Sequence, residues 1–431
     1  MVEAIRFSSM KHRAHAWRAM RQPSYRLYFA GQAVSILGNW IQQVALGWLV
    51  YRLSGSAMLL GTVAFLAQIP QLVVSPLAGI IIDRSNIRHL MMVVQLGMLL
   101  QAVCLAVLTW TGLVAPWHIL VAAGAFGILN SFDVPLRHAY TSQLVQDRQD
   151  LPNAIALNSL FFNLARFIGP PLAGAILAQT SEAACFALNA LSFVAIIGVM
   201  SHLRTSPQAH SSAAFADVMC EGMAFVRQSF SVRHILWQVA LLNFLAANYI
   251  PLMPAFARDV FRGGPEALGL LLGCAGAGAL LASLMLASRR SVRGLSGTVA
   301  FANLLAGFSL LAFALSRDIW LASMMLFLLG FALVSGNASS NTILQTIVPE
   351  HLRGRVLSLY SAANLGAAAL GGLLSGALAD YCGPGESLIL MGILLIAAAL
   401  FFFFRLELFR MYLRPIYARL GIKHPNKGQE S

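Results

Sequence analysis

Twelve separate runs of about 20 apolar residues follow one another along the 431-residue chain. A helix of that length spans the hydrocarbon core of a bilayer, where every backbone polar group needs an internal partner. Only 10% of the residues are charged and 58% are apolar. A soluble fold of this size does not cover so much apolar surface with water-compatible groups. The sequence therefore predicts an all-α membrane protein with twelve transmembrane helices.

The runs form two sets of six. The first set lies at residues 25–52, 57–82, 89–110, 117–142, 151–179 and 182–203, and the second at 232–258, 266–287, 296–315, 319–347, 353–381 and 387–405. Apolar residues in the segment between the sets fall on one helical face, which predicts an amphipathic helix at the membrane interface. We expect five regions: a basic N-tail (1–24), a six-helix half (25–203), a linker (204–231), a second six-helix half (232–405) and a basic C-tail (406–431).

The basic residues predict the orientation of the chain. With the N-terminus in the cytoplasm, 24 of the 29 Lys and Arg residues lie inside, four lie outside, and Arg166 falls within a span. Cytoplasmic loops carry such an excess of Lys and Arg. Both termini are therefore expected in the cytoplasm. The formal charge of +13 then meets anionic lipid headgroups, so we expect a bilayer partner and no nucleic acid.

The two halves are weakly similar to each other. When the chain is shifted by 202 residues, Gly169 aligns with Gly371 and Gly174 aligns with Gly376. The fifth and eleventh runs are thus predicted to be repeats. Parallel six-helix repeats are one architecture of secondary transporters, in which the substrate binds between the halves near the midplane.

Motifs for enzymes and for ATP are missing from the sequence. It contains no H-E-x-x-H or G-x-S-x-G pattern, and its three lysines do not form a phosphate-binding loop. The five cysteines are scattered without C-x-x-C spacing, which favours packing roles over a metal site. We expect no enzyme activity, no metal and no cofactor, with energy drawn from an ion gradient.

A charged segment joins the second and third runs. It holds Gly79, Asp83, Arg84 and Arg88. The glycine permits close helix approach, and the Asp83 carboxylate suits a helix N-terminus or an arginine. The segment is predicted to act as a conformational switch; the alternative is a solvated charged turn.

This segment resembles the loop signature of the major facilitator superfamily, G-x-x-x-D-R-x-G-R-R, with Asn86 in place of the second glycine and Ile87 in place of the first arginine. Gly169, Pro170 and Gly174 in the fifth run resemble the antiporter signature of that superfamily's exporters. Further matching blocks resemble the branch that includes the bacterial enterobactin exporter. The resemblance implies proton-driven export of small molecules across an inner membrane. The alternative reading of the fifth run is a kinked, closely packed helix.

Polar residues within the spans are candidates for the substrate cavity, because a polar group facing lipid is costly. Taken singly, each of them is better explained by an interhelical hydrogen bond; taken together, they predict a water-filled central cavity. The resemblance implies that the first, fourth, seventh and tenth helices line the cavity. The predicted cavity residues are Asn39, Gln43, Asn248, Tyr249 and Asn341. In the seventh span, Pro251 and Pro254 predict a bend close behind Asn248.

Arg166 is the only arginine well inside a span, and we predict that it is a functional charge paired with Asp133. An unpaired charge near midplane costs at least about 2.5 kcal/mol, so a partner is expected. Protonation of Asp133 would then free Arg166 for an anionic substrate. The alternatives are a fixed structural salt bridge, or a pair between Asp133 and Arg137 one turn away.

The sequence taken as a whole predicts a monomeric secondary transporter of the major facilitator type in the bacterial inner membrane. Its expected activity is proton-coupled export of a small organic molecule that is siderophore-like or drug-like. A lipid or lysolipid flippase, a passive facilitator and a membrane-embedded assembly factor are the alternative functions.

Overall fold

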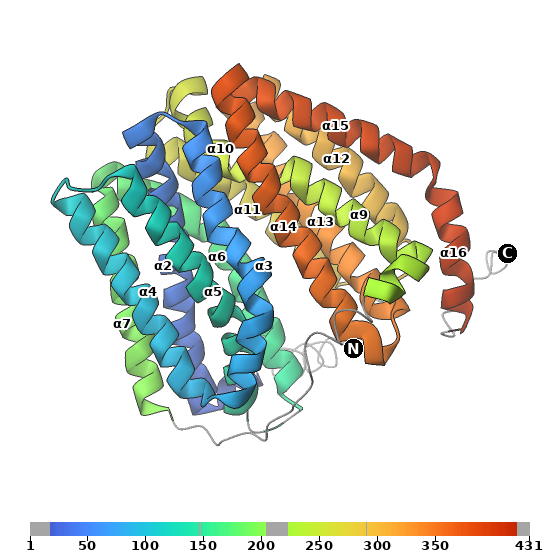
Figure 1. The fold of residues 1–431 in the computed structure, drawn as a ribbon, viewed down its shortest axis with the longest axis horizontal. Helices are drawn as coiled ribbons and strands as arrows, with labels where there is room; N and C mark the ends of the chain where they lie inside the picture. The colour runs from blue at the N-terminus through green and yellow to red at the C-terminus, as the bar shows by residue number, and fades with distance from the viewer. Residues whose placement is uncertain (1–17, 146, 148, 204–222, 290, 420–431) are drawn as a thin grey trace, which may run out of the picture.

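The computed structural model describes residues 18–145, 147, 149–203, 223–289 and 291–419. Two groups of helices make up the molecule, one on each side of Figure 1. The N half contains α2 (Pro23–Ser54), α3 (Ala57–Arg84), α4 (Ile87–Trp110), α5 (Pro116–Leu144), α6 (Leu151–Gln179) and α7 (Glu182–His202). The C half contains α9 (Phe230–Ala246), α10 (Tyr249–Ala255), α11 (Pro265–Ala287), α12 (Leu295–Leu315), α13 (Ile319–Ile347), α14 (Glu350–Cys382) and α15 (Pro384–Phe404). The described residues contain no strand.

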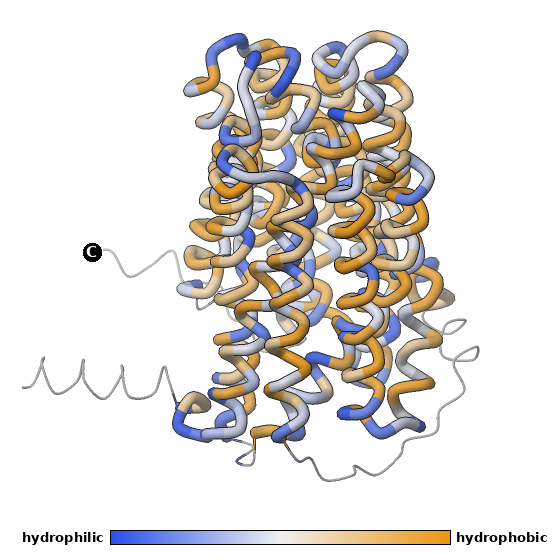
Figure 2. Tube along the Cα trace, turned by 90° about the vertical axis from the view of Figure 1, so that its left-hand side faces the viewer, coloured by the Kyte–Doolittle hydropathy of each residue, from blue (hydrophilic) through white to orange (hydrophobic). Residues whose placement is uncertain are grey.

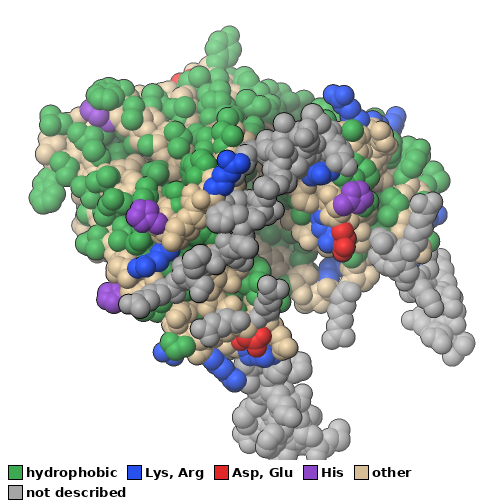
Figure 3. Space-filling view, turned by 60° about the horizontal axis from the view of Figure 1, so that its bottom comes forward, with side chains coloured by type: hydrophobic (Ala, Val, Ile, Leu, Met, Phe, Trp, Pro, Cys, Tyr) green, Lys and Arg blue, Asp and Glu red, His purple; other side chains and the backbone are tan. Residues whose placement is uncertain are grey.

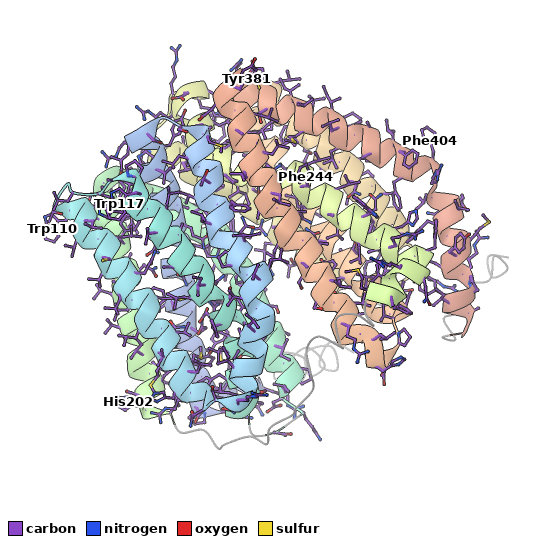
Figure 4. All side chains as sticks on the ribbon, viewed as in Figure 1. Trp110, Trp117, His202, Phe244, Tyr381 and Phe404 are labelled. Carbon is purple, nitrogen blue, oxygen red and sulfur yellow. The ribbon has the colours of Figure 1, made fainter. Side chains whose placement is uncertain are left out.

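Twelve segments of the described chain are long and apolar enough to cross a membrane. The predicted twelve-helix fold is therefore confirmed. In Figure 2, apolar residues dominate the middle of the helices and polar residues gather toward both ends. Large aromatic side chains are exposed near helix ends: Trp110 is 85%, Trp117 60% and Tyr381 92% exposed (Figure 4). Such side chains suit the boundary between lipid and water.

The seventh span is divided into three pieces. Helix α9 ends at Ala246, α10 runs from Tyr249 to Ala255, and a π-helix covers Phe256–Val260. Pro251 and Pro254 explain the break, because neither has an amide hydrogen for the carbonyl four residues earlier. The predicted bend is thus present, and it places α10 beside the space between the halves.

Two glycine-lined seams join the halves. Helix α6 crosses α11 at Gly174, where an added Cβ would lie 2.6 Å from Pro265 O and 3.0 Å from Gly269 Cα. Helix α14 crosses α3 at Gly376, where an added Cβ would lie 2.6 Å from Ala57 O and 3.1 Å from Gly61 Cα. The two glycines aligned by the 202-residue shift thus make equivalent contacts. Only glycine lets the backbones approach this closely.

Polar contacts across the halves lie at the end of the bundle that holds the α2–α3 turn, which we call the closed end. Asp380 of α14 accepts hydrogen bonds from Ala57 N at 2.6 Å and Ser56 Oγ at 2.7 Å. A carboxylate is favoured there, because the first amides of α3 have no helical partners. The Tyr51 hydroxyl also donates to Asp259 across the halves. From this end, α3 and α14 diverge toward what we call the diverging end (Figure 1).

Residues 406–419, expected as part of a basic tail, form helix α16 (Leu406–Arg419). Its Phe409 and Leu413 are buried, and Tyr412 stacks on Phe230 with ring centroids 4.3 Å apart. The helix therefore packs on the C half. The amphipathic linker helix was predicted from residues 215–227, and its part up to residue 222 lies outside the described residues; residues 223–228 are helical.

Candidate functional site

A cavity of about 360 Å³ lies between the halves, and we call it the central cavity. Its walls come from α2, α3, α4, α5 and α6 of the N half and from α10, α11 and α14 of the C half. Its polar lining residues are Gln42, Gln43, Gln68, Gln71, Gln101, Asn130, Arg166 and Tyr249. A mostly apolar cleft of this size with a few polar groups is typical of small-molecule sites.

Arg166 is the one charged residue in the described lining of the central cavity. Tyr249 of the C half lines the same cavity, and its hydroxyl interacts electrostatically with the Arg166 guanidinium. Helix α6 continues through this point with one backbone hydrogen bond fewer, because Pro170 has no amide hydrogen for the Arg166 carbonyl. Gly276 of α11 packs on that carbonyl, where an added Cβ would lie 2.5 Å from the oxygen. The arginine thus sits where the two halves meet.

The predicted pairing of Arg166 with Asp133 is not made in this structure. The Asp133 side chain is fully buried, and its Oδ2 accepts hydrogen bonds from the Arg137 guanidinium, with Nε at 2.6 Å. Its Oδ1 accepts from Gln95 Nε2 at 2.7 Å. One helical turn separates Asp133 from Arg137 on α5, so the alternative pair is the one that forms.

Of the five predicted cavity residues, Gln43 and Tyr249 line the central cavity. Asn39 accepts a hydrogen bond from Asn189 of α7 at 3.5 Å, inside the N half. The other two also form hydrogen bonds elsewhere: Asn248 donates to the Phe244 carbonyl, and Asn341 accepts from Gln345 at 3.0 Å. Among the described residues, the tenth span (α13) contributes nothing to this lining.

Cysteine labelling separates cavity residues from packing residues. We expect Gln43→Cys and Tyr249→Cys to react with a small, water-soluble methanethiosulfonate reagent in the purified protein. Asn39→Cys is expected to stay unreactive, because Asn39 does not line the cavity and its side chain accepts a hydrogen bond from Asn189 inside the N half. The measurement is the labelled fraction by intact-protein mass spectrometry, in a background without native cysteines. Equal reactivity at all three positions would contradict the assignment.

The switch segment lies at the diverging end. Arg88 of α4 donates to the carbonyl oxygens of Met200 at 3.0 Å and Ser201 at 2.7 Å. These are carbonyls at the C-terminus of α7, where a cation is favoured. Arg84 is exposed, and an added Cβ at Gly79 would meet open space. The Asp83 side chain lies outside the described residues. The switch role of this segment stays a prediction.

A second cavity, of about 340 Å³, lies within the N half between α2, α5 and α6, and we call it the N-half cavity. Arg137 lines it together with Gln32, Tyr28 and a group of phenylalanines. This cavity was not predicted from the sequence, because Gln32 stands alone among small and apolar residues and belongs to no recognisable motif. The spacing of Asp133 and Arg137, four residues apart within a span, was the one sequence feature that indicated a buried ion pair at this place.

The sequence model of the family described as transmembrane secretion effector matches residues 14–416. The chain belongs to this family. It is a major facilitator superfamily transporter and not an enzyme. The staphyloferrin A transporter of Staphylococcus aureus is 26% identical over 382 residues, which cover 88% of this chain and 95% of the relative. The enterobactin exporter EntS of Escherichia coli is 25% identical over 387 residues, with 87% and 91% covered.

Solved structures of transporters share the fold of this family member. A bacterial homologue of the human lysosomal transporter Spinster, solved in an inward-facing and unoccupied conformation, superposes with a TM-score of 0.70 at 14% sequence identity. The match covers 91% of this chain and 98% of that one. The twelve-helix major facilitator architecture is thereby confirmed.

Proposed function

We propose that this transporter exports a small organic molecule across the inner membrane by alternating access, driven by protons. The observation that carries the proposal is the central cavity, which both halves line and which holds one half-buried arginine, Arg166. Secondary transporters bind substrate at such an interface and expose it to either side by rocking the halves. The printed names of the relatives, a staphyloferrin A transporter and an enterobactin exporter, support a small organic substrate.

The diverging end is proposed to face the cytoplasm. Figure 3 shows this face, where arginine side chains lie on both halves. Cytoplasmic faces of membrane proteins carry an excess of these residues. The seams and the polar contacts at the closed end then shut the path to the outside. A substrate therefore enters from the cytoplasm in this conformation.

Asp133 is the group that we propose to carry the proton. It is buried within a span, and a buried carboxylate in a transporter commonly serves a proton relay. Its carboxylate holds Arg137 in place while it is ionised. After protonation it no longer neutralises the guanidinium, so Arg137 is released toward the N-half cavity that it lines. Proton binding thus changes the shape and charge of the N half.

Flux measurements in proteoliposomes test the proposal. Purified protein is first screened by thermal shift against organic anions, drugs and lysolipids, because a ligand stabilises the folded state by mass action. With the ligand found, we expect an imposed pH gradient to drive net flux through the wild-type protein. We expect Asp133→Asn to lose this gradient-driven flux and to keep exchange of labelled for unlabelled ligand.

An Arg137→Lys variant is the matched control, because it keeps a charge beside Asp133 and should retain part of the pH-driven flux. Normal pH-driven flux in Asp133→Asn would overturn the coupling role. Flux that ignores the pH gradient in the wild-type protein would instead indicate a passive facilitator. Flux of a lysolipid without a pH gradient would indicate a flippase.

A further inference from the structure

The N-half cavity is separate from the central cavity. Trp40 lines the central cavity and Phe162 lines the N-half cavity, and their ring centroids lie 6.3 Å apart. The two side chains therefore form part of the wall between the cavities. A volume of about 340 Å³ falls within the range of small-molecule pockets. The cavity is thus large enough to hold an organic group of its own.

Gln32, like the Tyr28 hydroxyl one turn earlier on α2, is a buried polar group of this cavity without a hydrogen-bond partner among the described residues. It is 5% exposed, and neither its amide oxygen nor its amide nitrogen has a hydrogen-bond partner among the described residues. Elsewhere in the same half, buried amides are paired, as Gln42 is with Gln101 at 2.9 Å. Leaving an amide buried and unpaired is costly. A ligand in the cavity would supply the missing partners.

Aromatic rings form another part of the wall. Phe29 and Phe161 contact each other edge to face, with ring centroids 5.6 Å apart, and both line the cavity with Phe162. Rings arranged in this way present faces and edges on which a flat ligand ring packs favourably. The wall therefore suits an aromatic group better than a flexible chain.

The charges at the cavity balance each other. Arg137 and His138 are the basic residues of the lining, Asp133 behind it neutralises Arg137, and among the described residues no acidic side chain belongs to the lining. Both described hydrogen bonds of the guanidinium, from Nε and Nη2, go to Asp133, so Nη1 is left for an oxygen acceptor. A cationic ligand would find no acidic side chain in this lining. An anionic ligand would meet the Arg137–Asp133 pair, which carries no net charge.

We infer that the N-half cavity is a second ligand site, which takes an uncharged aromatic group bearing a carbonyl or hydroxyl oxygen. The ring packs on Phe29, Phe161 and Phe162. The oxygen accepts from Arg137 and Gln32, while a donor on the ligand meets the Gln32 carbonyl. This inference rests on the proposed function, because it assigns part of the substrate to a site beside the central cavity.

Photo-crosslinking with 4-benzoylbenzamide tests the site. This probe is uncharged and aromatic, and carries a ketone and an amide. Light excites the ketone, which inserts into a nearby C–H bond and becomes a tertiary alcohol. We expect labelled peptides from the stretches of α2 and α6 that contain Phe29 and Phe161. Labelling confined to the central cavity, or to lipid-facing positions, would overturn the inference.

Two variants sharpen the test. Gln32→Leu should lower labelling about fivefold, the equivalent of one hydrogen bond. The same variant should raise the Tm of the ligand-free protein, because an unpaired buried amide is replaced by an apolar group of similar size. A residue with only a structural role would instead lose stability on replacement. Lower stability with unchanged labelling would therefore contradict the assignment.

Phe161→Ala is the second variant and should also lower labelling severalfold. Phe301→Ala, which removes a 61% exposed ring of α12, is its control and should not change labelling. The labelling experiment does not depend on transport, so the proposed function and the second ligand site can be disproved independently. Flux without labelling of the N-half cavity would remove this inference alone. Labelling of that cavity in a protein that transports nothing would remove the proposed function alone.

Discussion

Replacing Arg166 with Gln is expected to abolish transport of an anionic substrate while leaving the protein folded. The guanidinium is the one charge in the described central cavity, so the variant removes the only cation that an anionic group meets there. Loss of a charge-assisted hydrogen bond costs about 1.5–3 kcal/mol, which is about 10- to 100-fold in affinity. The measurements are ligand affinity by thermal shift and flux in proteoliposomes.

The stability of the variant separates a functional charge from a structural one. A charge inside a membrane span costs free energy unless it is paired, so Arg166→Gln should leave the Tm unchanged or raise it. Arg166→Lys keeps the charge and should retain part of the flux. Tyr249→Phe removes the hydroxyl that interacts with the guanidinium and should have a smaller effect. A large drop in Tm with normal ligand affinity would show that the arginine holds the fold.

Adding one methyl group at a seam should hold the closed end apart. In Gly376→Ala the new Cβ would lie 2.6 Å from Ala57 O, a backbone atom that cannot turn away. Overpacking of this kind costs about 1–3 kcal/mol, which changes the ratio of closed to open forms by about 5- to 100-fold. Gly174→Ala should have an equal effect, because its contact with Pro265 O has the same length.

Spin labels at Leu53 and Tyr381 measure the effect, since both are exposed at the closed end and lie on opposite halves. We expect the distance distribution to gain a longer component in both seam variants and flux to fall with it. Gly124→Ala is the control, because its new Cβ would meet nothing within 4 Å. A seam variant whose distances match this control would show that the glycines do not set the closed state.

The fold was predictable because its signals are local. Each span is a long apolar run, and Pro251 with Pro254 indicated the break that separates α9 from α10. The 202-residue shift also identified Gly174 and Gly376, which occupy equivalent seams. Helix α16 was missed because its charged residues suggested a tail, whereas Phe409 and Leu413 are buried against the C half.

The site was predicted less completely, because neighbours across helices depend on helix rotation. Gln43 lines the central cavity whereas Asn39, one turn earlier on the same helix, pairs within the N half. Asp133 is at a depth that suggested Arg166, yet its carboxylate points to Arg137 on its own helix and to Gln95 of α4. The position of a residue along its helix, and so its depth in the membrane, can be read from the sequence. The direction of its side chain depends on how the helices pack.

Two different kinds of contact hold the closed end together: the glycine seams, and a carboxylate contact that we call the latch. At the seams, a glycine of one helix packs on the backbone of the facing helix. These contacts therefore depend on neither charge nor side-chain rotamer. The latch is the Asp380 carboxylate on the first amides of α3, and solvent reaches this residue. A change at Asp380 should therefore bias how long the path stays shut while the backbone contacts at the seams stay in place. Charge at the latch and backbone packing at the seams are thus two separate controls on the closed form.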